Sequence, residues 1–314
     1  MSPTQPVEPR TGTVEFRGHQ TWYRITGDLQ SGSRPPLVVL HGGPGAAHNY
    51  CLSMAELSAD GRAVVHYDQI GCGNSTHLPD ADPDFWSVEL FIDELTNLVE
   101  HLGISTGFHL LGQSWGGMLG PEFVLARPEG VLSLTICDSP ASMGLWLQAA
   151  GQLRAELPRD VQEVLSHHEE EGTTDDPAYE KAMEVFYARH VCRVQPLPPD
   201  VAASFAQIDA DPTVYHTMNG PSEFHVVGTL KDWTVVDRVA GILVPTLVVS
   251  GRYDEAMPLT WAPFVDRIPD VRSHVFAESS HMPHVEETTA FLDVVGSFLR
   301  EQDPPMPNPL TRRG

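Results

Sequence analysis

The sequence predicts a doubly wound α/β fold, in which helices cover a mostly parallel sheet and one helical insertion interrupts the pattern. Continuous apolar runs recur along the chain, and such runs are typical of strands buried on both faces of a parallel sheet. Segments with helical periodicity lie between these runs. The alternation stops between Pro140 and Leu230 and then resumes, which indicates the insertion.

The strands begin with a predicted hairpin, formed by residues 14–16 and 21–25 and joined at Gly18. Five continuous apolar runs follow, at residues 37–40, 63–67, 108–111, 131–137 and 246–250. The clearest helix is predicted over residues 88–102, where apolar side chains recur at spacings of three and four. Right-handed crossovers would connect these elements, and ligands in such sheets bind beyond the carboxyl ends of the strands.

The domain organisation follows from the interruption in this alternation. Residues 140–230 carry helical patterns and Pro-rich breaks, so we expect a helical cap inserted into a core made of residues 1–139 and 231–300. A run at residues 273–277 predicts one more strand, and residues 288–300 predict a last helix. The Pro-rich, polar tail at residues 301–314 is expected to be disordered.

The composition excludes several classes of protein. The 314 residues include 42 Asp and Glu against 19 Lys and Arg, and this formal charge of -23 argues against binding to nucleic acid or to an anionic membrane surface. No apolar run is long enough to span a bilayer and the first residues lack a leader pattern, so we expect a cytoplasmic protein. The four cysteines show no metal-binding spacing and are expected to be reduced thiols. The sequence carries no signal for the oligomeric state.

A candidate nucleophile lies directly after the run at residues 108–111. Residues 112–117 read GQSWGG, a GxSxG motif in which a sharp strand-to-helix turn would expose Ser114 at the edge of the sheet. The glycines are needed because the turn brings neighbouring backbone too close for side chains. The motif alone is weakly specific, and its position between a buried strand and a helix is what favours a nucleophilic serine.

A serine nucleophile needs a base, and the base needs an orienting carboxylate, in the chain order Ser, Asp or Glu, His. Asp254 and His281 each follow a predicted strand and supply this order. His274 and His284 are alternatives to His281, but His274 lies within a strand and His284 is nearer the next helix. Simpler interpretations exist, since an Asp after a strand is often a turn residue and a chain with 15 histidines places some of them in loops.

The predicted oxyanion hole is the HGGPG motif at residues 41–45, which ends the first buried strand. Its glycines would let a backbone N–H approach the substrate, and the N–H of Trp115 would be the second donor. A plain glycine-rich turn and a phosphate-binding loop are the alternatives. The second is disfavoured because the chain contains neither GxGxxG nor a P-loop pattern.

Five motifs together carry a resemblance to a known family. They are HGGPG at 41–45, YDQIGCGNS at 67–75, GQSWGG at 112–117, NGPSEF at 219–224 and GRYDE at 251–255. From about residue 14 to residue 299 the chain resembles the proline iminopeptidase (prolyl aminopeptidase) family of α/β-hydrolases. NGPSEF and the nearby KDW segment are most similar to the tricorn-associated aminopeptidases of that family, which carry Tyr where this chain has Trp115.

The resemblance implies the α/β-hydrolase fold and a set of site residues. The matching triad positions are Ser114, Asp254 and His281. The matching oxyanion donors are the backbone N–H groups of Gly43 and Trp115. Glu223 and Glu255 match the two carboxylates that hold the free α-ammonium of the substrate, the group that distinguishes a chain end from an internal peptide bond. Without the resemblance, each glutamate is interpreted equally well as a solvated surface residue.

The expected function is a metal-independent serine aminopeptidase that needs no cofactor and releases an N-terminal proline or another small apolar residue from short peptides. An amino-acid amidase acting on prolinamide-like substrates, or an esterase or lactonase, would use the same triad. A metallohydrolase using His281, His284 and Glu286 is disfavoured because their spacing lacks the HExxH pattern. A non-catalytic binding protein is disfavoured by the complete triad.

The cap is expected to cover the site and to exclude long or folded substrates. Its aromatic residues either line the substrate pocket or form the core of the cap, and the core is the favoured interpretation. These residues are Trp146, Phe186, Tyr187 and Phe205.

Overall fold

The computed structural model describes residues 8–30, 33–127 and 129–305. Its strands are β1 (Arg10–Phe16), β2 (His19–Thr26), β3 (Leu37–Leu40), β4 (Val64–Asp68), β5 (Phe108–Gln113), β6 (Val131–Cys137), β7 (Thr246–Gly251) and β8 (Val271–Phe276). In this part of the chain they form one eight-stranded sheet with the order β1-β2-β4-β3-β5-β6-β7-β8. β1 and β2 form an antiparallel hairpin, β2 pairs antiparallel with β4, and the pairings from β4 to β8 are parallel. The predicted α/β fold with its mostly parallel sheet is confirmed.

The continuous apolar runs form the central strands of this sheet. Every residue of β3, β4, β5 and β7 is buried, as expected for strands that helices cover on both faces. Val38 and Leu40 pack into the apolar core on one face, whereas Leu37 and Val39 pack into the core on the other. β8 is mostly exposed because it forms an edge of the sheet. The four cysteines are buried free thiols.

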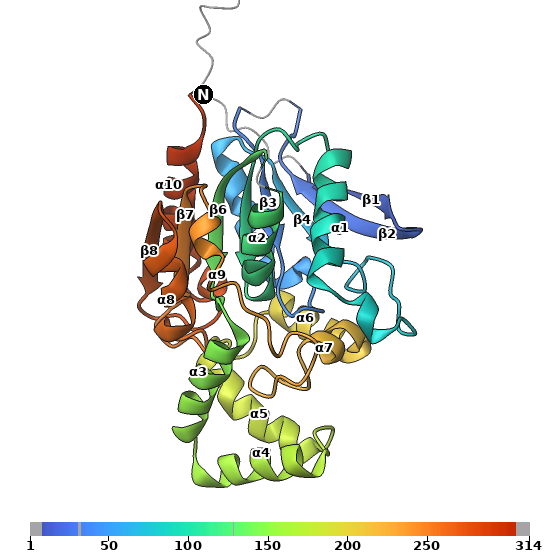
Figure 1. Cartoon of the computed structure of the whole chain (residues 1–314), viewed down its shortest axis with the longest axis vertical. Helices are drawn as coiled ribbons and strands as arrows, with labels where there is room; N and C mark the ends of the chain where they lie inside the picture. The colour runs from blue at the N-terminus through green and yellow to red at the C-terminus, as the bar shows by residue number, and fades with distance from the viewer. Residues whose placement is uncertain (1–7, 31–32, 128, 306–314) are drawn as a thin grey trace, which may run out of the picture.

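Helices cover the sheet and extend beyond one end of it (Figure 1). The α-helices of the described chain are α1 (Val88–His101), α2 (Trp115–Ala126), α3 (Met143–Ala155), α4 (Arg159–Glu171), α5 (Pro177–His190), α6 (Pro199–Ala210), α7 (Thr213–Met218), α8 (Pro258–Arg267), α9 (Pro283–Glu286) and α10 (Thr288–Gln302). Three 3-10 segments join them: η1 (His48–Asp60), η2 (Pro83–Phe85) and η3 (Val239–Gly241). None of these helices is both long and apolar enough to cross a bilayer.

The predicted helix at residues 88–102 corresponds to α1. It begins where the Ser87 hydroxyl accepts a hydrogen bond from the N–H of Leu90, which satisfies one of the free donors of the first turn. Its apolar stripe, which includes Phe91, Leu95 and Leu98, is buried against the sheet core. The helical periodicity of the sequence therefore reports the face that α1 buries.

Helices α3 to α7 lie between β6 and β7 in the chain. Figure 1 shows α3, α4 and α5 beyond the carboxyl ends of the parallel strands. They pack on one another around a separate apolar cluster that includes Leu153, Leu165, Tyr179 and Phe186. This cluster lets the segment hold its shape apart from the sheet.

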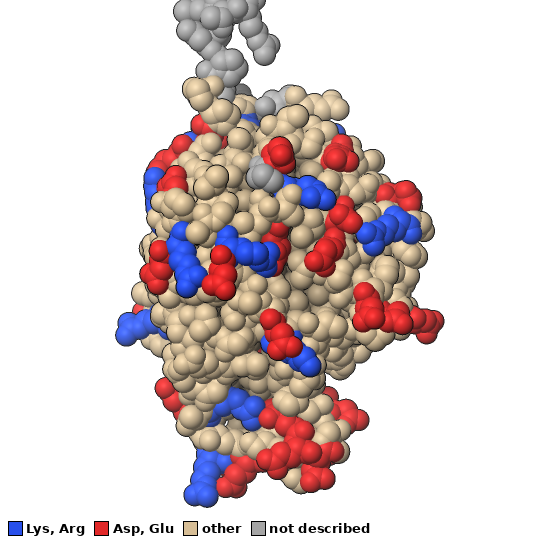
Figure 2. All heavy atoms as spheres, viewed as in Figure 1, with Lys and Arg blue, Asp and Glu red and all other residues tan. Residues whose placement is uncertain are grey.

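Acidic side chains gather on this segment. Figure 2 shows them over the lower end of the molecule, where α4 and α5 lie in Figure 1. The last turn of α4 ends in three consecutive glutamates, Glu169, Glu170 and Glu171. At physiological ionic strength their charge is screened over about 8 Å, so it acts on the nearby solution more than on groups at the sheet.

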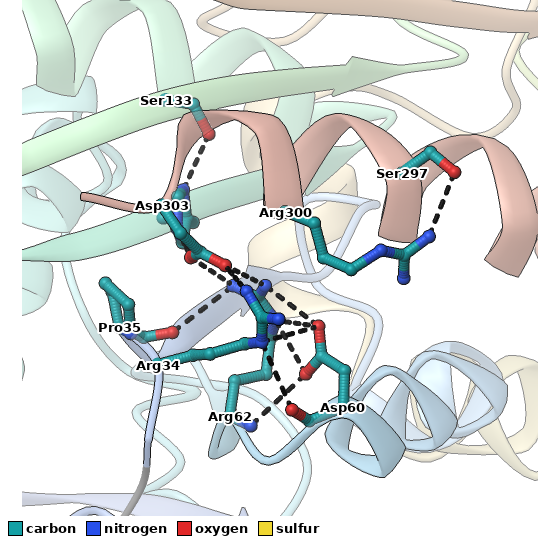
Figure 3. Close-up of polar contacts among 9 residues, drawn as sticks. Arg34, Pro35, Asp60, Arg62, Ser133, Ser297, Arg300 and Asp303 are labelled. Atoms are coloured by element: carbon teal, nitrogen blue, oxygen red, sulfur yellow. Dashed lines mark hydrogen bonds and ion pairs between the residues drawn. The ribbon is translucent and has the colours of Figure 1, made fainter. Parts of the chain in front are cut away.

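A buried ion cluster closes the opposite end of the sheet, near the amino ends of β4 and β5 (Figure 3). The guanidinium of Arg62 is fully buried and donates hydrogen bonds to Asp60 and Asp303 at 3.0 Å and 3.1 Å. Arg34 also binds Asp303, and Nε2 of His109 lies 3.0 Å from its Oδ1. Burial alone would raise the pKa of Asp303, but the hydrogen bond from Arg34 and the charge of Arg62 hold this pKa below its usual value.

This cluster corrects the predicted start of the disordered tail. The tail is expected to begin at Glu301, yet α10 continues through Gln302, and Asp303 is held by the two arginines. The composition of the tail cannot show this, because Arg62 lies 241 positions away in the chain. Residues 306–314 lie outside the described residues.

Replacing Asp303 with alanine should lower the free energy of unfolding by about 3 kcal/mol, since it leaves buried arginine charge without one of its carboxylates. The measurement is chemical denaturation at pH 7. Ser297→Ala is the matched control on the same helix, because it removes only the exposed hydrogen bond from Arg300 to Ser297 (Figure 3) and should change stability by less than about 0.5 kcal/mol. Equal midpoints for the two variants would contradict this account.

Candidate active site

Ser114 lies in a strained turn between a buried strand and a helix. β5 ends at Gln113 and α2 begins at Trp115, and Ser114 between them has φ 54° and ψ -120°. Residues other than glycine rarely adopt this backbone conformation, which costs of order 1–3 kcal/mol. A Cβ atom on Gly112 would lie 1.9 Å from the carbonyl oxygen of Gly116, so the glycine at that position is sterically required. The turn has the geometry that the GxSxG motif predicts.

Two polar side chains tie this turn to its neighbours. Gln113 accepts a hydrogen bond from the hydroxyl of Tyr50 at 2.5 Å, and its amide donates to the carbonyl of His281 at 2.8 Å. The same hydroxyl of Tyr50 accepts from the N–H of Gly42 at 2.6 Å. Gln113 and Tyr50 therefore join the loops that carry Ser114, His281 and the glycines. Sequence reasoning missed both residues, although Gln113 stands next to the predicted nucleophile.

The structure brings Asp254 and His281 together. Asp254 lies in the loop after β7 and His281 in the loop after β8, and both are buried. Nδ1 of His281 lies 2.7 Å from Oδ1 of Asp254. The carbonyl of His190, at the end of α5, accepts hydrogen bonds from the N–H groups of both His281 and Glu255. The C-terminus of α5 thus fixes the two loops relative to each other.

This contact favours the charged form of both partners. Burial alone would lower the pKa of His281, but the adjacent carboxylate of Asp254 raises it above its usual value. Burial alone would raise the pKa of Asp254, whereas the charge and hydrogen bond of His281 lower it. Oδ2 of Asp254 also accepts from the Ser250 hydroxyl at 2.9 Å, and Oδ1 accepts from the N–H of Ala256 at 2.8 Å. The pair has the arrangement of a histidine base and its orienting acid.

The alternative histidines face elsewhere. Nε2 of His284 lies 3.1 Å from the carbonyl of Tyr50, and burial lowers the pKa of this histidine to about 3. His274 is exposed on β8. Glu286 accepts from the hydroxyl of Ser280 at 2.9 Å. Among the residues that the structure describes, no group of three or more His, Cys, Asp or Glu side chains is placed to hold a metal ion.

Glu223 and Glu255 lie beside the histidine, and Glu255 is buried whereas Glu223 is half-buried. Glu255 is 2% exposed, its Oε1 has no hydrogen-bond partner, and that atom lies 3.8 Å from Nε2 of His281. Glu223 accepts a hydrogen bond from the Tyr215 hydroxyl at 2.7 Å. Burial, followed by the charges of Glu223 and Asp254, raises the pKa of Glu255 well above its usual value. Burial also raises the pKa of Glu223. Two neighbouring carboxyl groups, one of them with an unpaired oxygen, are complementary to a small cation, because the cation would stabilise their ionised forms.

A small pocket connects Glu223 to the serine. It encloses about 10 Å³ and is lined by Ser114, the Gly43–Pro44 segment, Trp115 and Glu223, which leaves room for about one water molecule. Its apolar walls are Met118, Met143, Trp146 and Leu230. A second, larger cavity of about 1000 Å³ is lined by residues of α5, α6 and α7 and shares Glu223 with the small pocket.

The four aromatic residues of the insertion divide between these places. Trp146 lines the small pocket and is also buried in the main apolar core, whereas Phe186 is fully buried in the apolar cluster of α3 to α5. Tyr187 and Phe205 are partly buried and line the larger cavity. The expectation of core is therefore correct for Trp146 and Phe186, and Tyr187 and Phe205 also face a cavity. The helical spacing of a buried aromatic cannot show which side of the helix faces a cavity.

Comparison with known proteins decides the family. A family model for the alpha/beta hydrolase fold matches residues 35–288. Proline iminopeptidases of Clostridium botulinum and Lactobacillus helveticus are each 35% identical to the chain over 294 residues, which is 93% of this chain and 98% of theirs. The chain belongs to the proline iminopeptidase family of α/β-hydrolases. The predicted resemblance is confirmed.

Solved structures agree with this assignment. The proline iminopeptidase of Mycobacterium smegmatis is 55% identical, with a TM-score of 0.87 over 93% of this chain and 98% of that one. The protein VinJ is also 55% identical, with a TM-score of 0.92 over 93% of this chain and 99% of that one. Est816, described as an N-acyl homoserine lactone degrading enzyme, is 20% identical with a TM-score of 0.66, and this likeness shows a common fold only.

Proposed function

We propose that this member of the proline iminopeptidase family is a serine aminopeptidase that releases an N-terminal proline or another small apolar residue from short peptides. The observation that carries the proposal is the placement of the acidic side chains. The Asp254–His281 pair lies beside the strained Ser114 turn, because Gln113 donates a hydrogen bond to the carbonyl of His281. Within the described chain, no lysine or arginine forms an ion pair with Glu223 or Glu255, and Glu255 lies 3.8 Å from Nε2 of His281. This arrangement suits a substrate whose cleavable bond lies next to a free ammonium.

The proposed reaction proceeds through an acyl-enzyme. Oγ of Ser114 attacks the carbonyl carbon and its proton passes to Nε2 of His281, while Asp254 holds the opposite side of the imidazole. The N–H groups of Gly43 and Trp115 stabilise the oxyanion, and one such donor typically contributes about 3–4 kcal/mol. As the C–N bond breaks, the leaving amine takes the proton from His281. Water then repeats these steps on the ester, releasing the free amino acid and restoring the serine.

The relative positions of the residues also support a division of the chain. In the proposal, residues 1–139 and 231–300 form the hydrolase core and residues 140–230 form the cap. The cap supplies Glu223 and Trp146, and the core supplies the triad. The apolar side chains that line the small pocket, which include Met118, Met143 and Leu230, suit an apolar acyl group such as proline.

The proposal is tested by turnover and by covalent labelling. The protein should hydrolyse a prolyl arylamide faster than a phenylalanyl or lysyl arylamide, and a fluorophosphonate should label Ser114 and abolish this turnover. Comparing kcat/KM on prolinamide and on Pro-Xaa dipeptides separates an amidase from a peptidase. Absence of labelling, together with turnover that persists after reagent treatment, would overturn the proposed mechanism.

Activity should rise with pH, and the midpoint of this ascending limb should lie above the usual pKa of histidine. The pKa of His281 is raised by Asp254, and the base acts only when neutral, so activity is lost as pH falls. Glu255 and Glu223 also have raised pKa values, and they must ionise to hold an ammonium, which moves the limb in the same direction. Above about pH 8 the amine of the substrate itself loses its proton. The kcat/KM profile should therefore be bell-shaped, and a flat profile from pH 5 to pH 7 would contradict this reasoning.

A further inference from the structure

A further buried acid, Asp138, lies next to the triad. It directly follows β6, it is fully buried, and its N–H donates to the carbonyl of Val249 on β7 at 2.8 Å. Its Oδ1 accepts from the N–H of Gly251 at 3.3 Å. Because β6 and β7 are neighbours in the sheet, Asp138 is placed against the loop that carries Asp254.

The two carboxyl groups lie against each other. The side chains of Asp138 and Asp254 are close enough for a hydrogen bond, and such a bond needs a proton on one of them, because two ionised carboxylates are both acceptors. Oδ2 of Asp138 is buried and accepts no hydrogen bond from any N–H or O–H group of the described chain, so this oxygen is free to carry the proton. Oδ1 of Asp254 already accepts from His281, and Oδ2 accepts from Ser250. Asp254 is therefore the acceptor in this contact, and the proton belongs to Asp138.

The surroundings agree with this placement of the proton. Burial, followed by the charge of Asp254, raises the pKa of Asp138 well above its usual value. Glu286 on α9 acts in the same direction, and the neighbouring thiol of Cys137 is neutral because burial raises its pKa. The groups with the largest effects on Asp138 in the described chain include no cation.

We propose that Asp138 is a positioning residue for the reaction: its protonated carboxyl donates a hydrogen bond to Asp254 and holds that carboxylate at the angle that orients His281. The inference rests on the proposed function, since it concerns the same triad. Ser250, Ala256 and Asp138 then all donate to Asp254. A ligating or orienting group held in this way loses rotational freedom, and loss of such outer contacts typically costs about tenfold to a hundredfold in rate.

The backbone at this position decides which variants are informative. Asp138 has φ 52°, a left-handed conformation that Asn and Gly adopt with little strain, whereas Ala does not. Asp138→Asn keeps a hydrogen-bond donor and removes the ability to ionise. Asp138→Gly removes the side chain without adding strain. Thr135→Val is the matched control, because Thr135 lies buried on the same strand and its hydroxyl has no hydrogen-bond partner.

The experiment measures kcat, KM and the ascending pH limb on a prolyl arylamide for the wild type and these three variants. Asp138→Asn should keep kcat within about threefold and leave the midpoint of the limb unchanged, since Asp138 is already neutral. Asp138→Gly should lower kcat by about tenfold to a hundredfold with little change in KM. Thr135→Val should behave like the wild type.

Two results would overturn the inference. A midpoint that moves down by about one pH unit in Asp138→Asn would show that a negative charge had been removed. Wild-type kcat in Asp138→Gly would show that no positioning is needed. The asparagine test decides the protonation state even if the glycine variant fails to fold. The rate of fluorophosphonate labelling at Ser114 is measured in the same variants, so a wrong substrate class, seen as no arylamide turnover by the wild type, is distinguishable from a wrong role for Asp138.

Discussion

Ser114→Ala should lower kcat for a prolyl arylamide by about 10⁶-fold while leaving the denaturation midpoint close to that of the wild type. The hydroxyl is the only group at the turn that the proposed reaction changes covalently. Within the described chain, the hydrogen bonds of residue 114 to Cys137, Gly117 and Met118 all run through its backbone, so the substitution leaves them in place. Alanine keeps the same Cβ atom, so packing at the turn is retained.

The measurement is steady-state hydrolysis with an enzyme preparation checked for contaminating peptidase. Ser297→Ala, on the exposed side of α10, controls for loss of a serine remote from the site and should retain full activity. Activity above about one per cent in Ser114→Ala would exclude this serine as the nucleophile, because removing a triad serine costs far more than a hundredfold.

Glu255→Gln should lower kcat/KM for substrates with a free amine by about a hundredfold to a thousandfold, and Glu223→Gln should have an effect of the same kind. Each change replaces an ionisable carboxyl beside the serine with a neutral amide of nearly the same shape. The loss corresponds to about 3–4 kcal/mol, as expected when one member of a buried, hydrogen-bonded charge pair is removed. An ester of similar size that lacks the amine should be hydrolysed at nearly the wild-type rate.

The two substrates are compared in each variant. Glu163→Gln on α4 is the control for loss of an acidic residue, because Glu163 is exposed and forms an ion pair with Arg159 on the surface of the same helix. Neither glutamine variant at the site should be less stable than the wild type, since burial disfavours the charged form of both glutamates. Equal losses on the amine-bearing and amine-lacking substrates would contradict the proposal that Glu223 and Glu255 hold the substrate amine.

The sheet and the triad candidates could be predicted because local patterns encode them. The apolar runs became the buried strands, and Ser114, Asp254 and His281 all lie at the carboxyl ends of strands. Each of these features depends on residues close together in the sequence. The two glutamates were found only through the family resemblance, because nothing in their local pattern distinguishes them from surface acids.

What the sequence did not predict depends on contacts between distant residues. Tyr50 and Gln113 are 63 positions apart, and Arg62 and Asp303 are 241 apart. Asp138 directly follows a predicted strand, yet its proposed role depends on contact with Asp254, which lies on the loop after β7. A buried polar group is informative only when its partner is known, and periodicity does not identify partners.

The central claim is that the site recognises a free N-terminal amine, and one ratio tests it most directly. This is kcat/KM for a prolyl arylamide divided by kcat/KM for its N-acetylated counterpart, with the N-methyl derivative as a control that adds bulk but keeps the positive charge. The ratio of the free to the acetylated substrate should exceed about 10³, and the ratio of the free to the methylated substrate should be much smaller. Similar rates on the free and the acetylated substrate would contradict it.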